Sequence, residues 1–396
     1  KNVPYSSAII KEKLTPLTTQ LKETIKRDGP ISIAKYMREA LTNPKSGYYM
    51  KDDVFGEKGD FITSPEVSQM FGELIGIWFL TQWMSQGKPQ KIQIVELGPG
   101  RGTLLDDMLR AMSNFKECYE TIDGVHLIEI SPGMRRIQRL KLCGNVENGR
   151  EDNAEVVSRE SDGLKFFWRD SIEEIPGRWS IIVSHEFFDA MPIHGFELKK
   201  NGWHEITVDV DDSEDSPRHL RFESSTGPTS PAAFTNLPPP EKFKIGDRIE
   251  ISPESWKISK QIAKYIHDNG GASLIIDYGK DFIQGDTLRA IKRHKFLHPL
   301  CLPGLADLSA DVNFQYLKES AKGLVNTYGP ITQSRFLQTL GIKTRLSMLL
   351  ENAPPNRREI LVSSYKRLID PLSMGEIYKV LAFIPKGSTG VPVAFE

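Results

Sequence analysis

The sequence predicts an α/β fold with a doubly wound, mostly parallel sheet of seven strands. Short apolar runs alternate with helical stretches along the chain, which is typical of parallel βαβ units. One of these units, at residues 92–109, has three glycines at alternate positions between its apolar run and its helix. A strand, a tight glycine turn and a helix in this order begin a nucleotide-binding unit.

The glycine turn consists of Gly98, Gly100 and Gly102. The apolar run before it is too short for a helix and indicates a buried parallel strand. Thr103 is the expected N-cap of the helix that follows. Glycines let a ligand approach the backbone closely, although such a turn is not by itself specific for one ligand.

Glu96, near the end of this strand, narrows the choice of ligand. A dinucleotide site holds a pyrophosphate on free backbone N–H groups, and a carboxylate would repel that phosphate. Pro99 also removes one N–H donor. S-adenosylmethionine has no phosphate and carries a cationic sulfonium and an ammonium group, so an acidic strand end suits it. The turn therefore favours a methyl donor over NAD.

The bulk composition is that of an ordinary globular protein. Of 396 residues, 39% are hydrophobic and 26% charged, and 51 basic against 52 acidic residues leave a formal charge of −1. No basic field predicts nucleic acid or an anionic membrane as a partner, and no apolar run reaches membrane-spanning length. Cys118, Cys143 and Cys301 are scattered without metal-ligand spacing, which predicts idle thiols in a reduced compartment and no metal site.

The N-terminal region is expected to be helical. Apolar spacing predicts one helix over residues 7–26 and a second from a Ser32 cap to residue 40. A long buried helix then begins at Ser64, with proline at its first turn. The polar run at residues 59–64 is a candidate lid, and its Thr63 and Ser64 are candidate cofactor contacts.

Six further strands complete the expected sheet, at residues 125–130, 164–168, 179–184, 272–276, 324–328 and 377–383. A β-rich insertion begins with a hairpin whose turn is Lys200-Asn201-Gly202. We expect three parts: an N-terminal helical extension and lid at 1–86, a Rossmann-like core at 87–193 and 253–396, and the β-hairpin and loop insertion at 194–252.

The first three strands all end in polar residues. A methyl-donor site needs such residues, since the ligand lies across the carboxyl edge of the sheet. Glu96 ends the first strand, and Glu129 ends the second, where a carboxylate can accept hydrogen bonds from both ribose hydroxyls. Asp170 and Ser171 follow the third and are candidates for binding the adenine amino group. Each alone has a plainer interpretation as a solvated loop residue, but three strand ends in register favour a site.

The fourth strand runs into the sequence HEFFDAMP at residues 185–192 and should face the reacting atom. An arginine acceptor carries a guanidinium that is always protonated in water. A buried carboxylate holds such a cation through charge-assisted hydrogen bonds. Glu186 is the candidate for this role, with Asp189 in support, and the two phenylalanines between them would wall the pocket. The plainer interpretation is that Asp189 caps a local turn.

Six segments together resemble a known family. They are GDFITSPEVSQMFGE, VELGPGRGTLLDDML, HEFFDAMP, LIIDYG, DTLRAIKRH and MGEIYKVLAF. In this order, from about residue 31 to residue 383, they resemble the MidA family of the mitochondrial complex I assembly factor 7 type. The resemblance implies a class I S-adenosylmethionine-dependent methyltransferase of the mitochondrial matrix. It also implies symmetric dimethylation of arginine on the 49-kDa-type subunit of respiratory complex I, in support of complex I assembly.

The family's functional residues carry over onto matching positions of this sequence. Gly98, Gly100 and Gly102 would form the cofactor turn. Glu129 would be the ribose ligand. Glu186 and Asp189 would be the acidic pair of the acceptor motif. His185 departs from the pattern, because bacterial relatives tend to carry Asn there, so no role that requires an amide transfers to it. The first residue is Lys1 rather than Met, which fits the removal of a targeting segment.

Other functions stay open on the sequence alone. One is a methyltransferase for a small amine or another side chain. A second is a non-catalytic assembly factor, in which bound S-adenosylmethionine only stabilises a binding surface. Intact Glu186 and Asp189 argue against a pure scaffold, and Glu96 and Pro99 argue against an oxidoreductase. A homodimer is one option for the assembly.

Overall fold

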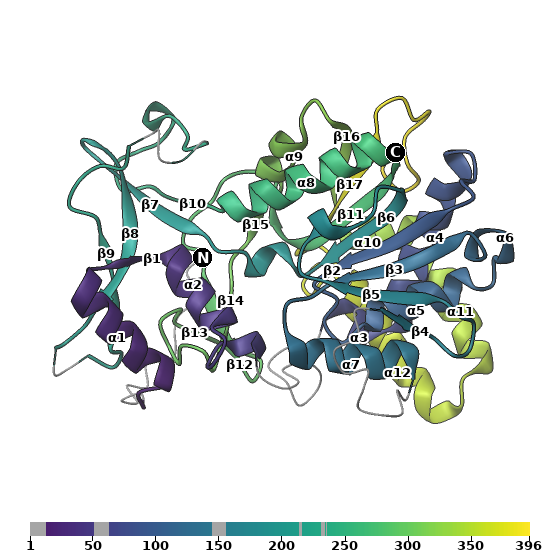
Figure 1. The fold of residues 1–396 in the computed structure, drawn as a ribbon, viewed down its shortest axis with the longest axis horizontal. Helices are drawn as coiled ribbons and strands as arrows, with labels where there is room; N and C mark the ends of the chain where they lie inside the picture. The colour runs from purple at the N-terminus through teal and green to yellow at the C-terminus, as the bar shows by residue number, and fades with distance from the viewer. Residues whose placement is uncertain (1–12, 51–62, 145–155, 214–215, 231–233, 235) are drawn as a thin grey trace. The chain divides into compact units, whose positions relative to one another are not determined.

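A computed structural model of the chain describes residues 13–50, 63–144, 156–213, 216–230, 234 and 236–396 (Figure 1). The chain forms two compact units. The first consists of residues 1–61, 189–256 and 282–313, and the second of residues 62–188, 257–281 and 314–396. In the part of the chain that the structure describes, no helix is both long and apolar enough to cross a membrane.

The second unit is built on a sheet with the strand order β16-β17-β11-β6-β2-β3-β5-β4. These strands are β2 (Ile92–Leu97), β3 (Ile122–Ile128), β4 (Val156–Ser158), β5 (Lys165–Arg169), β6 (Trp179–His185), β11 (Gly271–Lys280), β16 (Val325–Thr332) and β17 (Tyr378–Pro385). β2, β3, β5, β6 and β11 run parallel, whereas β4, β16 and β17 are antiparallel to their neighbours. The seven expected strands are present, and the mostly parallel α/β sheet is confirmed.

The direction of the strand order reverses at β2. From β2 the chain adds β3 and β5 on one side and then β6 and β11 on the other. Ligands of open α/β sheets bind outside the carboxyl ends of the strands at such a switch point. Leu97 of β2 pairs in register with Ser184 of β6. The glycine turn and the HEFFDAMP segment therefore leave the sheet from adjacent strand ends.

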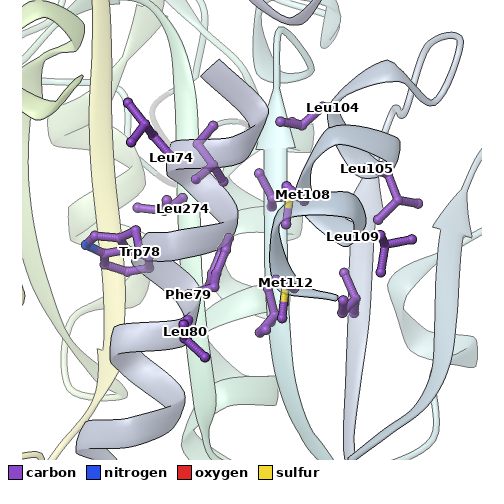
Figure 2. Packing of buried hydrophobic residues seen from close by; sticks show 14 of the residues in the cluster. Leu74, Trp78, Phe79, Leu80, Leu104, Leu105, Met108, Leu109, Met112 and Leu274 are labelled. Carbon is purple, nitrogen blue, oxygen red and sulfur yellow. The ribbon is translucent and has the colours of Figure 1, made fainter. Parts of the chain in front are cut away.

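Helices pack on the sheet of the second unit. They are α3 (Ser64–Val67), α4 (Gln69–Ser85), α5 (Thr103–Met112), α6 (Lys116–Tyr119), α7 (Pro132–Cys143), η2 (Ile172–Glu174), α9 (Phe314–Ala321), α10 (Gln333–Thr339), α11 (Ile342–Asn352) and α12 (Pro355–Ile369), and α8 (Pro253–Asn269) belongs partly to each unit. Figure 2 shows α4 and α5 against the sheet, with Trp78 and Phe79 of α4 and Met108 of α5 in one buried cluster with Leu274 of β11.

Two glycines let α4 and α5 approach each other closely. A β-carbon on Gly72 would lie 2.6 Å from Cβ of Asp107, and one on Gly76 would lie 3.0 Å from the carbonyl oxygen of Met108. Each fully buried Leu, Phe or Met side chain in this interface contributes roughly 1.5–3 kcal/mol to stability. The helix that follows the glycine turn is therefore held in a densely packed layer.

The first unit has a core of its own, which includes Leu17 of α1 and Tyr36 of α2. Its helices are α1 (Pro16–Asp28), α2 (Ile33–Thr42), η1 (Tyr48–Met50) and η5 (Pro240–Lys242), and η3 (Phe188–Ala190) joins the two units along the chain. One sheet has the order β1-β8-β7-β10 with β9 beside β8, and a smaller one has the order β13-β12-β14. Their bounds are β1 (Ile31–Ser32), β7 (His194–Lys199), β8 (Gly202–Val210), β9 (Leu220–Ser224), β10 (Arg248–Ile251), β12 (Arg289–Lys292), β13 (Lys295–Leu297) and β14 (Asp307–Ser309), and β15 is Val312–Asn313. The hairpin expected around Lys200-Asn201 is confirmed by the pairing of β7 with β8.

The expected start of the first helix is wrong. Residues 13–15 are not helical, and α1 begins at Pro16, with the Thr15 side chain accepting a hydrogen bond from the Thr18 N–H at 3.0 Å. Proline lacks an N–H and disrupts a helix interior, so Pro16 fits only the first turn. Residues 7–12 lie outside the described part of the chain.

Two other helices also differ from expectation, one in its N-cap and one in its length. Gly102, with φ 81°, is the N-cap of α5 in place of Thr103, because the turn reaches the helix through a left-handed residue. The helix that begins at Ser64 ends at Val67, since Ser68 is extended and caps α4 through the Met70 N–H. Residues 59–62 of the candidate lid fall outside the described residues.

Candidate active site

The turn after β2 adopts a conformation that glycine tolerates without strain. Gly98, Gly100 and Gly102 have φ angles of 62°, 51° and 81°, in the left-handed region where a β-carbon is costly. The N–H of Gly102 donates to the Pro99 carbonyl at 2.7 Å and closes the turn. A β-carbon on Gly98 would lie 2.8 Å from Cδ2 of Phe187. The turn therefore packs directly against the segment that follows β6.

Glu96 lies in β2 just before this turn and has a buried carboxyl group. It is 2% exposed, and its Oε2 has no hydrogen-bond partner among the described residues. Burial raises the pKa of Glu96 well above its usual range, because the charged form loses its hydration. A buried polar atom without a partner is costly, and a cationic group placed there would restore the charge of the carboxylate. This site fits the ammonium or sulfonium of S-adenosylmethionine and does not fit a phosphate.

Glu129 directly follows β3, and its carboxylate is held from two sides. Oε1 accepts a hydrogen bond from the Ser131 N–H at 2.8 Å, and Oε2 accepts one from Nε2 of Gln138 at 3.1 Å. Burial raises the pKa of Glu129, and these hydrogen bonds oppose the rise. Each carboxylate oxygen has a further lone pair. The oriented side chain thus keeps acceptor capacity for ribose hydroxyls.

Asp170 and Ser171 follow β5, but both already have partners in the protein. Oδ1 of Asp170 accepts a hydrogen bond from Arg135 at 2.6 Å, and the Asp170 side chain is 75% exposed. Ser171 forms a capping box with Glu174, whose Oε1 accepts from the Ser171 N–H at 3.1 Å. Recognition of adenine by these two residues stays a prediction.

Thr63 and Ser64 lie at the start of α3. Thr63 is the N-cap and forms a capping box with Glu66. Ser64 is fully buried, and its hydroxyl donates to Oε1 of Gln333 at 3.2 Å. Thr63 therefore stabilises the start of α3, and Ser64 connects α3 to α10. Their contact with the cofactor stays a prediction.

Glu186 follows β6 in an uncommon backbone conformation. Its φ is 49°, a left-handed value that is uncommon for a residue with a β-carbon and costs about 1–3 kcal/mol. Its N–H donates to the Ile276 carbonyl at 3.0 Å, and its Oε1 accepts from the Tyr378 hydroxyl at 2.8 Å. The Glu186 side chain is 13% exposed. The end of β6 thus holds a largely buried carboxylate in a fixed position.

His185 lies beside this carboxylate as a neutral ring. Its imidazole meets the Phe71 ring edge-on and stacks on the Tyr378 ring, with centroids 5.1 and 6.1 Å away. Burial lowers the pKa of His185 to about 3. Nε2 lies 3.6 Å from Oε1 of Glu186. A neutral imidazole is therefore not a cationic partner of Glu186.

Asp277 fixes the backbone that follows Glu186. It is 1% exposed, and its Oδ2 accepts hydrogen bonds from the N–H groups of Phe187 and Phe188 at 3.2 and 3.0 Å. The sequence places Asp277 at the end of the fifth strand and gives no further sign of this role. The role follows from the parallel pairing of β6 with β11.

Asp189 lies in the short helix η3 and is 7% exposed. Its carbonyl oxygen accepts a hydrogen bond from the Ala310 N–H at 2.9 Å. It belongs to the first unit, whereas Glu186 belongs to the second. Support of Glu186 by Asp189 stays a prediction.

The chain is similar to known methyltransferases in sequence. Residues 74–331 match the family described as "Putative S-adenosyl-L-methionine-dependent methyltransferase". The "Protein arginine methyltransferase NDUFAF7, mitochondrial" of Danio rerio is 44% identical over 383 residues, which cover 96% of this chain and 88% of the relative. The Homo sapiens protein of the same name is 40% identical over 377 residues, covering 94% and 84%. The Drosophila melanogaster homologue is 40% identical over 391 residues, covering 97% and 88%.

A solved structure has the same fold. It is a protein from Burkholderia thailandensis bound to S-adenosyl-homocysteine, and it matches with a TM-score of 0.77 over 100% of this chain and 97% of its own. The two sequences are 24% identical. This likeness agrees with the expected methyltransferase fold.

Proposed function

The chain belongs to a family of S-adenosylmethionine-dependent methyltransferases, and on this premise we propose that it methylates arginine side chains of a protein. Membership of the family gives the reaction class and the cofactor. The proposal concerns the group that accepts the methyl group. The observation that carries it is the carboxylate of Glu186, which is held beside the cofactor turn.

Three contacts keep this carboxylate in place. The Tyr378 hydroxyl binds Oε1, Asp277 fixes the backbone after Glu186, and Phe187 packs on Gly98 of the turn. A guanidinium presents five N–H donors in a planar fork that matches a carboxylate. In the proposed complex, the guanidinium would bind this carboxylate beside the Tyr378 hydroxyl.

The charges at the site suit methylation of a cation. When bound, S-adenosylmethionine supplies a methyl group on a positively charged sulfur. The acceptor arginine enters fully protonated, and Glu186 draws the guanidinium charge toward the two nitrogens that it binds. The third nitrogen would then donate its electron pair to the methyl carbon as the carbon–sulfur bond breaks. The neutral thioether S-adenosylhomocysteine would leave, and the methylated nitrogen would lose one proton to water. Because the carboxylate is already oriented, little reorganisation accompanies the reaction.

Residues on the first three strands would hold the cofactor. Glu96 would bind its cationic groups, the glycine turn would contact its amino-acid part, and Glu129 would bind the ribose. Asp170 and Ser171 would reach the adenine, and Thr63 and Ser64 would contact the cofactor from the start of α3. Among the described residues, Oε2 of Glu96 has no hydrogen-bond partner, which supports the first assignment. The left-handed glycines support the second.

The relatives suggest where the protein works and on what. Their names call them mitochondrial and protein arginine methyltransferases, which indicates a mitochondrial location for this chain. With the family resemblance of the sequence, this supports a finer proposal. The protein acts in the matrix on the 49-kDa-type subunit of complex I and produces symmetric dimethylarginine.

Transfer of labelled methyl groups tests the acceptor. The protein is incubated with methyl-labelled S-adenosylmethionine and the isolated 49-kDa-type subunit, and the products are read by mass spectrometry. Free arginine and small primary amines are offered in parallel. Symmetric dimethylarginine on the subunit supports the proposal, whereas label on small amines alone overturns the protein acceptor. Cofactor binding without transfer, beside normal complex I assembly, overturns catalysis in favour of a scaffold.

A further inference from the structure

Gln138 of α7 connects the ends of three strands through one amide group. It is fully buried. Its Nε2 donates to the carbonyl of Gly100 at 2.7 Å and to Oε2 of Glu129 at 3.1 Å, and its Oε1 accepts from the indole N–H of Trp168 at 2.9 Å. Gly100 follows β2, Glu129 follows β3, and Trp168 lies in β5.

These partners determine the orientation of the amide. An indole nitrogen can only donate a hydrogen bond, so the amide oxygen of Gln138 must face Trp168. The two amide hydrogens then point at two acceptors, the Gly100 carbonyl and the Glu129 carboxylate. If the amide were flipped, its NH2 group would face the indole N–H of Trp168. Its oxygen would then face the Gly100 carbonyl and the Glu129 carboxylate. Both donors of Gln138 are therefore used at the cofactor turn.

The buried neighbours of Gln138 one helical turn before and after it are apolar. Met134 and Leu142, four residues before and after it, are buried on the same face of α7. Leu142 also packs on the turn, since a β-carbon on Gly102 would lie 3.1 Å from its Cδ1. An apolar residue at 138 would continue this stripe, so packing alone does not account for an amide there.

We propose that Gln138 is a positioning residue for the ribose of S-adenosylmethionine. It binds the Glu129 carboxylate and the Gly100 carbonyl at once, and so holds the ribose ligand at a fixed distance from the glycine turn. Gln138 acts through these two residues, and the inference rests on the proposed ribose contact of Glu129. Removing the amide leaves Glu129 in the site with its Ser131 hydrogen bond but frees its second oxygen to turn.

The main test replaces Gln138 by methionine, which keeps the length of the side chain and removes its hydrogen bonds. Gln93→Met is the matched control. Gln93 is 2% exposed, lies near the amino end of β2, and donates to the Pro176 carbonyl at 2.7 Å. Both variants lose buried hydrogen bonds and should lose thermal stability, but Gln93 is at the end of the strand away from the turn.

Trp168→Phe is a milder second variant. It keeps an aromatic ring in the core, although a smaller one, and removes the indole N–H that orients the amide. Gln138 then stays in place but is no longer forced to present both donors to the turn. This variant keeps the inference testable if the methionine variant does not fold.

The readout is the preference of the full-length protein for a ligand with ribose hydroxyls. Affinities for S-adenosylhomocysteine and its 2′,3′-dideoxy analogue are measured by isothermal titration. We expect the wild type and Gln93→Met to prefer the hydroxylated ligand by about 10–100-fold, the scale of hydrogen bonds to a charged group. The preference should fall below about threefold in Gln138→Met and to an intermediate value in Trp168→Phe.

Two outcomes would overturn the inference in different ways. Equal preference in Gln138→Met and the wild type means that Gln138 only stabilises the fold, and the ribose role of Glu129 is then unaffected. No preference in the wild type removes the ribose role of Glu129 and the inference with it. Neither result bears on the acceptor, which the methyl-transfer assay tests separately.

Discussion

The hydroxyl of Tyr378 donates a hydrogen bond to Oε1 of Glu186 at 2.8 Å, although the two residues are 192 positions apart in the sequence. The sheet explains the contact. Glu186 follows β6, Tyr378 begins β17, and both strands flank β11. Because β17 is antiparallel to β11, its first residue lies at the carboxyl edge of the parallel strands. An antiparallel strand thus adds a tyrosine to the site.

Tyr378→Phe should slow methyl transfer without weakening cofactor binding. The change removes the hydrogen bond to Glu186 but keeps the ring that stacks on His185. Loss of one hydrogen bond to a charged group predicts roughly a tenfold lower rate. The measurement is single-turnover transfer at saturating S-adenosylmethionine. Tyr119→Phe, which loses a hydroxyl bonded to Asp162 at 2.6 Å, is the control and should keep the wild-type rate.

Gly100→Val should abolish cofactor binding in a folded protein. The φ of Gly100 is 51°, and a β-branched side chain is strained there and fills the space in which the ligand meets the backbone. Gly144→Val is the control, because Gly144 has φ 85° and no atom of the described residues lies within 4 Å of an added β-carbon. Circular dichroism checks folding, and titration with S-adenosylmethionine checks binding. Unchanged affinity in Gly100→Val would remove the turn from the site.

Glu129→Ala should weaken S-adenosylmethionine by about 1–3 kcal/mol through loss of charge-assisted hydrogen bonds to the ribose. Methionine has no ribose, so its binding should hardly change. Isothermal titration of both ligands measures the difference. Equal losses for the two ligands would mean that Glu129 acts through folding.

His185→Asn should change the pH dependence of stability. The pKa of His185 is about 3 in the folded protein against an ordinary value of 6.5. The unfolded chain therefore gains a proton on this ring below pH 6.5 while the folded protein does not, and the free energy of unfolding falls as the pH is lowered toward 3. The variant lacks this contribution. The wild type should lose stability relative to His185→Asn between pH 6.5 and 3, but not above pH 7.

Urea unfolding of both proteins across this pH range measures the effect. Other buried groups, such as His126 with a pKa of about 4 and Glu250 with a pKa of about 7, titrate in both proteins, so their contributions cancel in the difference. A difference that does not vary with pH would show that His185 is accessible to protons in the folded state.

The parallel core of the fold was predictable because its pattern is local. Apolar runs such as Ile92–Leu97, followed by helical spacing, define each βαβ unit within a few tens of residues. Glu96, Glu129 and Glu186 were predictable for the same reason, since each stands where a strand ends. Strand ends of one parallel sheet meet at one edge, so sequence position alone brings them together.

The residues that orient these carboxylates were not predictable. Gln138 reaches Glu129 from the inner face of a helix, and Tyr378 and Asp277 reach the segment after β6 from other strands. Such contacts depend on strand order and on which helix face turns inward. A single sequence does not record either. The same applies to residues 282–313. Their strands β12, β13 and β14 pair with one another, and side chains such as Leu300 and Leu308 pack in the core of the first unit, far in sequence from the N-terminal helices.

The most direct test of the acceptor site is the rate of methyl transfer by Glu186→Gln. Glutamine keeps the shape of the side chain and its acceptor for Tyr378, but removes the charge that binds the guanidinium. The rate of transfer to the 49-kDa-type subunit should fall by roughly 10²–10³, the scale of one preorganised electrostatic contact. Affinity for S-adenosylmethionine should stay within about threefold, and Asp189→Asn should cost less activity. Full transfer activity in Glu186→Gln would contradict the proposed mechanism.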